Sequence, residues 1–156
     1  MNRLFVRNHL PVLSNLNLSN RSLIIHHSDS YGATLVDDMI EMGIDVWQGC
    51  MSSNNLPELT RKSCGKIGFM GGFDGADFDT PDWNAEDIKE KVYALLDQCT
   101  PKAFIPCIAQ GGPGSIYDGV YDAIMAAIDD YNVEHFGIKR DEIVRKPMQD
   151  FAKGLM

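Results

Sequence analysis

Four short apolar runs, each followed by a segment with helical spacing, constrain the fold of this chain more than any other feature. The runs cover residues 22–26, 44–47, 66–70 and 103–107. They are nearly all apolar, which is typical of strands that are buried on both faces of a parallel sheet. Strands that alternate with helices favour parallel pairing through right-handed crossovers. The sequence therefore predicts an α/β fold made of consecutive βα units.

The segments between these runs carry recognisable helix ends. Gly43 and Gly65 are natural helix stops, and the stretch from Asn54 to Glu58 combines an asparagine cap with a proline in the first turn. Thr80 or Asn84 can cap the third helix. The sequence predicts an irregular lead-in over 1–21, helices over 33–42, 54–64, 84–96 and 116–128, a polar loop over 71–83, and one more helix near 140–153.

Polar side chains follow each apolar run, at the point where the strand would end. Such folds build their active sites at the carboxyl ends of the strands and in the loops just beyond. His26 is expected to face away from His27, because side chains alternate along a strand. The polar groups at the ends of the runs are His27 and Asp29, Gln48 and Cys50, Asp74, and Cys107 and Gln110. We expect Gln48, Asp74, Gln110 and Tyr31 to line a pocket for a small molecule.

The charge of the chain excludes several classes of partner. The net charge is −8, and no cluster of lysines or arginines interrupts the acidic balance. This argues against nucleic acid and against an anionic membrane surface as partners. With 44% hydrophobic residues over 156 positions, the chain can build the core of one ordinary domain.

Cysteine usage and the lack of long apolar runs point to the cytoplasm. No apolar run reaches the roughly 18 residues of a membrane span. The N-terminal residues lack the apolar region and cleavage site of a signal peptide. The four cysteines show no CxxC spacing, and we expect them to be thiols in a reducing compartment.

Two architectures satisfy four parallel strands in a row. Either the sheet is open and doubly wound, or the units form half of an eight-stranded barrel. Four blocks decide between them: HHSDSY at 26–31, DMIEMGIDVWQG at 38–49, FMGGFD at 69–74 and FIPCIAQGGPGSIYDGVYDAI at 104–124. In order and spacing, these blocks resemble the uroporphyrinogen decarboxylase superfamily, which includes cobalamin- or corrinoid-dependent methyltransferases.

The resemblance implies a (β/α)8 TIM-barrel family fold, of which this chain carries about the last four βα units. Residues 22–156 would form this C-terminal half of the barrel domain. The resemblance further implies methyl transfer between a corrinoid, carried on a partner protein, and a small acceptor or donor. The chain would then be a methyltransferase once the missing N-terminal half completes it. No catalytic residue is assigned.

Within the superfamily, zinc-dependent methyltransferases carry a His-x-Cys pair after one strand and a distant cysteine near the last. His27 falls on the family histidine, Asp29 replaces the first cysteine, and Cys107 lies near the second. Carboxylate, imidazole and thiolate are all zinc ligands. The resemblance therefore implies a zinc site of His27, Asp29 and Cys107, with the metal acting as a Lewis acid.

Two rival interpretations remain open from the sequence. The first is a metal-free uroporphyrinogen decarboxylase, a carboxy-lyase of porphyrin biosynthesis. Its substrate-binding residues would come from the other half of the barrel. The second is an inactive half-barrel whose role is assembly with the missing half or with a second copy of the chain. An open parallel edge favours such pairing.

Overall fold

The computed structural model describes residues 22–99, 103–110 and 115–143. Its centre is a four-stranded sheet in the order β1-β2-β3-β4, in which every neighbouring pair is parallel. The strands are β1 (Ile25–His27), β2 (Val46–Cys50), β3 (Gly68–Phe73) and β4 (Phe104–Ile108). The predicted parallel α/β fold is confirmed. The predicted lead-in over 1–21 lies outside the described residues.

Helices follow each strand, as predicted. Three short 3-10 turns accompany them: η2 (Ala33–Leu35), η3 (Ser52–Asn54) and η4 (Arg140–Glu142). The α-helices are α1 (Val36–Glu41), α2 (Leu56–Ser63), α3 (Gly75–Phe78), α4 (Ala85–Gln98) and α5 (Val120–Phe136). The side chain of Asn84 caps α4 by accepting a hydrogen bond from the Asp87 amide, so the predicted asparagine cap is correct.

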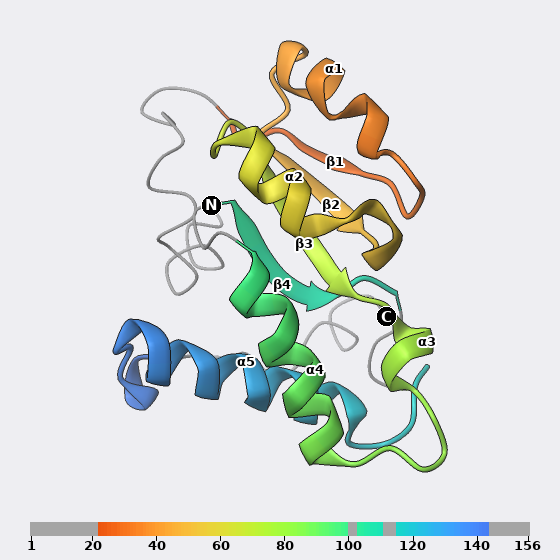
Figure 1. The fold of residues 1–156 in the computed structure, drawn as a ribbon, viewed down its shortest axis with the longest axis vertical. Helices are drawn as coiled ribbons and strands as arrows, with labels where there is room; N and C mark the ends of the chain where they lie inside the picture. Colours follow the sequence, from red (N-terminus) through yellow and green to blue (C-terminus); the bar gives the residue numbers. More distant parts are fainter. Residues whose placement is uncertain (1–21, 100–102, 111–114, 144–156) are drawn as a thin grey trace, which may run out of the picture.

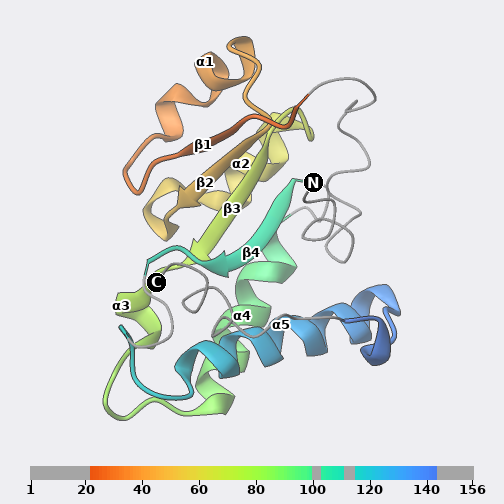
Figure 2. The same cartoon turned by 180° about the vertical axis from the view of Figure 1, so that it is seen from behind.

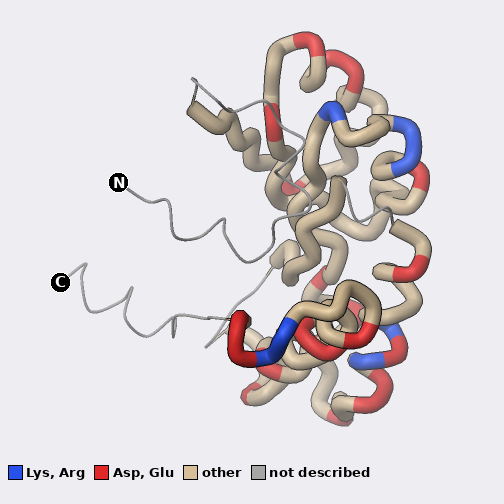
Figure 3. Tube along the Cα trace, turned by 90° about the vertical axis from the view of Figure 1, so that its left-hand side faces the viewer, with Lys and Arg blue, Asp and Glu red and all other residues tan. Residues whose placement is uncertain are grey.

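The helices α2 and α4 lie on one face of the sheet (Figure 1), and the view from behind looks onto the strands with α2 beyond them (Figure 2). The long helix α5 crosses α4 beside β4. Acidic positions are spread over the helices, and among the described residues Lys and Arg form no continuous stripe (Figure 3). None of the described helices has the length and apolar character needed to span a membrane.

The core consists of two apolar clusters, each of which includes a phenylalanine of β3. The first lies beneath α1 and α2 and is built around Trp47, Phe69 and Phe104, which share one register row across β2, β3 and β4. The second joins Phe73 to α3, α4 and α5. Residues of the apolar runs thus fill the core, as their composition predicts.

The sequence placed the strands too early along the chain. Residues 22–24 and 44–45, which were predicted as strand, precede β1 and β2. At the other end, β2 and β3 continue through Gly49, Gly71 and Gly72. Glycine has a low strand propensity, and it therefore led us to predict loops at these positions. The edge strand β1 also departs from prediction, because all of its residues are exposed. Ile24 and Ile25 are 47% and 54% exposed.

Helix boundaries show smaller departures. The predicted loop over 71–83 contains the last part of β3 and the short helix α3, which is too brief to show helical spacing. Helix α5 starts at Val120 and runs to Phe136, beyond the predicted end, and it ends where Gly137 adopts a positive φ. Of the helix predicted near 140–153, the turn η4 is described and residues 144–156 lie outside the described part.

Candidate functional site

The end of β1 and the end of β2 place three of the predicted site residues in contact. His27 pairs in register with Gln48, so their side chains leave the same face of the sheet. The Nδ1 atom of the His27 ring is hydrogen-bonded to Oε1 of Gln48. The Nε2 atom lies 3.5 Å from Oδ2 of Asp29. His26 pairs with the core residue Trp47 instead, as the predicted alternation requires.

This His27–Asp29–Gln48 cluster is open to solvent. The His27 side chain is 61% exposed and that of Asp29 is 34% exposed. A histidine held between a carboxylate and an amide can exchange a proton with a bound molecule, because both partners orient the ring. The cluster is therefore suited to general acid–base chemistry on a small molecule at the carboxyl edge of the sheet.

Gly49 allows the Asp29 carboxylate to lie against β2. Its φ is +90°, and a Cβ atom at this position would lie 2.1 Å from Oδ1 of Asp29. The register between β2 and β3 shifts between Gln48 and Cys50, so that Cys50 enters the core rather than the face of Gln48. Burial raises the pKa of the Cys50 thiol to about 12, and the charge of Asp74 adds to this effect. Cys50 is therefore a neutral core residue.

Asp74 and Gln110, both predicted pocket residues, lie near the loop that follows β2. The buried carboxylate of Asp74 accepts hydrogen bonds from the Ser52 amide, at 3.1 and 3.2 Å, and from the Ser52 hydroxyl, at 2.7 Å. The exposed Gln110 donates from Nε2 to Sδ of Met51 at 3.7 Å. Tyr31 is 65% exposed in the loop after β1. Gln48 thus lies with His27 and Asp29, whereas Asp74 and Gln110 form a second group beside the loop after β2.

The predicted zinc ligands are not brought together as a set. His27 and Asp29 are adjacent, but Cys107 lies on β4, and β2 and β3 separate this strand from β1. Burial raises the pKa of the Cys107 thiol to about 12, which favours the thiol over the thiolate that binds zinc. Among the described residues no three His, Cys, Asp or Glu side chains form a group that could hold a metal ion. As the structure places them, His27, Asp29 and Cys107 do not form a zinc site.

Asn54 is a structural residue of this edge that the sequence did not reveal. The pair Asn54–Asn55 predicted a helix cap, and Asn55 occupies the N-cap position of α2, but its side chain makes no capping hydrogen bond. The side chain of Asn54 is instead buried and bonded to the loop after β1. The two neighbouring asparagines have different roles, which the structure distinguishes and the sequence does not.

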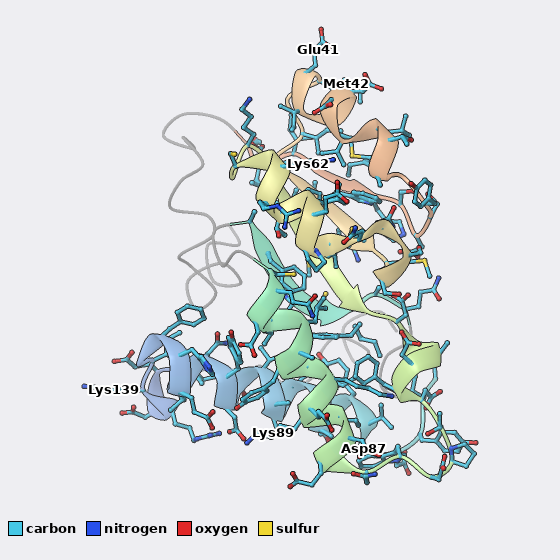
Figure 4. The ribbon with its side chains drawn as sticks, in the orientation of Figure 1. Glu41, Met42, Lys62, Asp87, Lys89 and Lys139 are labelled. Atoms are coloured by element: carbon cyan, nitrogen blue, oxygen red, sulfur yellow. The ribbon has the colours of Figure 1, made fainter. Side chains whose placement is uncertain are left out.

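A hollow lies away from this edge, along α4. Its lining is mostly charged and includes Asp87, Lys89 and Tyr93. Figure 4 shows Asp87 and Lys89 at the end of the molecule opposite α1. This groove brings together no side-chain arrangement with a chemical role, so the sheet edge remains the candidate site.

No protein-family model matches the sequence, and no curated protein matches it.

Proposed function

We propose that this chain is part of a uroporphyrinogen decarboxylase-superfamily enzyme, of the corrinoid-dependent methyltransferase kind. The proposed reaction moves a methyl group between a corrinoid, held by a partner protein, and a small acceptor or donor. The observation that carries the proposal is His27, held between Asp29 and Gln48 at the carboxyl edge of a parallel sheet. Active sites of β/α barrels lie at this edge.

The winding of the sheet supports a barrel origin. The strands follow one another in the order β1-β2-β3-β4 without a reversal. Doubly wound sheets reverse their strand order at the ligand-binding crevice, whereas barrels add each new strand on the same side. We propose that the four βα units correspond to four units of a (β/α)8 barrel.

The residues of the cluster can carry the proton that methyl transfer displaces. When an acceptor with an X–H group takes a methyl group, X forms a bond to carbon and loses its proton. We assign this proton to Nε2 of the His27 imidazole, because Nδ1 donates to Oε1 of Gln48, which orients the ring. The Asp29 carboxylate, 3.5 Å from Nε2, would stabilise the resulting imidazolium. When bound, the corrinoid would supply or accept the methyl group.

The test is methylation of small thiols and amines with methylcobalamin as the donor. We expect methylated product when the wild-type chain is assayed together with the N-terminal half of the barrel that completes it. His27→Ala should lower the rate by about 10²-fold, the usual contribution of a positioned acid or base. His26→Ala is the matched control, because it removes an adjacent histidine from the row of Trp47, and it should retain the wild-type rate. Equal losses in both variants, or no product with the wild type, would contradict the proposal.

The zinc implied by the resemblance stays a prediction of the sequence. Elemental analysis of the purified protein, wild type beside Cys107→Ala, decides it. Equimolar zinc in the wild type that is lost in the variant would support a site of His27, Asp29 and Cys107. A folded wild type without zinc would contradict that assignment and leave the acid–base role of His27 intact.

A further inference from the structure

Backbone hydrogen bonds hold the loop after β1 on both sides of the exposed residues Asp29 and Tyr31. At its start, the Ser28 carbonyl accepts a bond from Nε1 of Trp47 at 2.9 Å, and the Ser28 amide donates to the Gln48 carbonyl at 3.0 Å. Further along, the carbonyl of Ser30 and the amide of Gly32 are bonded to Asn54. The backbone is therefore fixed before and after Asp29, which keeps the Asp29 carboxylate beside His27.

Asn54 provides the second of these attachments. It is 1% exposed, and its Oδ1 atom accepts from the amides of Gly32 and Ala33 at 2.8 and 3.1 Å. Its Nδ2 atom donates to the carbonyls of Ser30 and Met51 at 3.0 and 3.3 Å. The carboxamide thus fills both acceptor and both donor positions with backbone groups, which is what a buried asparagine requires.

Asn54 is in turn fixed through the loop after β3. It ends the turn η3, and Ser52 begins that turn. The amide and hydroxyl of Ser52 both donate to the carboxylate of Asp74, which is 8% exposed. Hydrogen bonds to a carboxylate are stronger than those between neutral groups. A continuous series of contacts therefore links the end of β3 to the loop after β1.

We propose that Asp74, Ser52 and Asn54 form a polar brace that positions Asp29 and Tyr31 at the candidate site. These are positioning residues, because they act through the loop backbone. What the positioned side chains do rests on the proposed function, whereas the brace itself can be tested without any activity. The consequence is a remote effect. A change at Asp74 loosens the loop after β1, although the bonds of its carboxylate described here go to Ser52.

The test is amide hydrogen exchange of the full chain, measured separately in residues 29–33, in β3 and in residues 51–54. Asp74→Asn keeps the side-chain size and removes the charge. We expect exchange in residues 29–33 to rise by about tenfold, the equivalent of one well-placed hydrogen bond to a charged group. Exchange in β3 should stay at its wild-type value. Ser52→Ala should raise exchange in the same loop, and Ser52→Thr, which keeps the hydroxyl, should restore it.

Ser53→Ala is the matched control, because Ser53 is an exposed residue of the same turn. It should leave all three segments unchanged. Faster exchange confined to residues 51–54 in Asp74→Asn would overturn the brace, since the loop after β1 would then be fixed independently. An equal rise in β3 would overturn it as well, because the variant would simply be less stable. Failure of the methylation assay would leave these results untouched.

Discussion

Replacing Gly71 with alanine is expected to lower the free energy of unfolding by at least about 3 kcal/mol. Its φ is +146°, which strains any L-residue by about 1–3 kcal/mol. An added Cβ would also lie 2.4 Å from the carbonyl oxygen of Cys50. That oxygen belongs to the backbone of β2, so it cannot move without disturbing the pairing of β2 with β3. Urea denaturation, followed by circular dichroism, measures the loss.

Gly43→Ala is the matched control for this prediction. Gly43 also has a positive φ, +79°, but an added Cβ would meet nothing within 4 Å. The backbone strain alone should cost about 1–2 kcal/mol. Equal losses in the two variants would show that the close approach of Gly71 to Cys50 contributes nothing to the cost of the alanine.

Trp47→Ala is expected to cost about 3–5 kcal/mol, the range for truncating a fully buried tryptophan. Trp47 is 0% exposed, and its ring meets that of Phe69 edge-on with centroids 6.3 Å apart. The indole also lies against Gly32, where an added Cβ would be 3.1 Å from the ring. Thermal or urea unfolding gives the loss directly. A cost below about 1 kcal/mol would contradict the central place of this residue in the core.

Trp47→Phe separates the packing of the ring from its hydrogen bond. Phenylalanine keeps much of the apolar contact but cannot donate to the Ser28 carbonyl, which Nε1 of Trp47 reaches at 2.9 Å. We expect a cost of about 1–3 kcal/mol, dominated by the unsatisfied carbonyl and the lost ring volume. A loss equal to that of Trp47→Ala would mean that the retained ring contributes little.

The sequence predicted the architecture well because short apolar runs alternate with segments of helical spacing. The parallel sheet, the order of strands and helices, and the cap at Asn84 all follow from local patterns. Strand ends did not follow, because Gly49, Gly71 and Gly72 continue the strands in conformations that other residues rarely adopt. A glycine in the sequence indicates a turn. Only the structure shows that it lets the backbones of two neighbouring strands approach each other closely.

In the candidate site, too, some features could be predicted from the sequence and others could not. The sequence predicted that His27, Asp29 and Gln48 share one edge of the sheet, because residues at the ends of adjacent parallel strands lie together. It grouped His27 and Asp29 with Cys107, however, and not with Gln48. The burial of Cys50 could not, since it depends on a register shift between β2 and β3. The role of Asn54 was equally hidden, because its partners in the loop after β1 lie more than twenty residues earlier in the chain.

The distribution of the cysteines allows the protein to be labelled at a single site. Cys64, which follows α2, is exposed, whereas Cys50 and Cys99 are buried and Cys107 is partly covered. Burial raises the pKa of these three thiols to between about 11 and about 12, so they are poor nucleophiles at neutral pH. In a βα unit the helix runs back along its strand, which places Cys64 at the amino end of the sheet. A maleimide dye should therefore attach there, away from the edge that carries His27, and report on ligand binding without obstructing it.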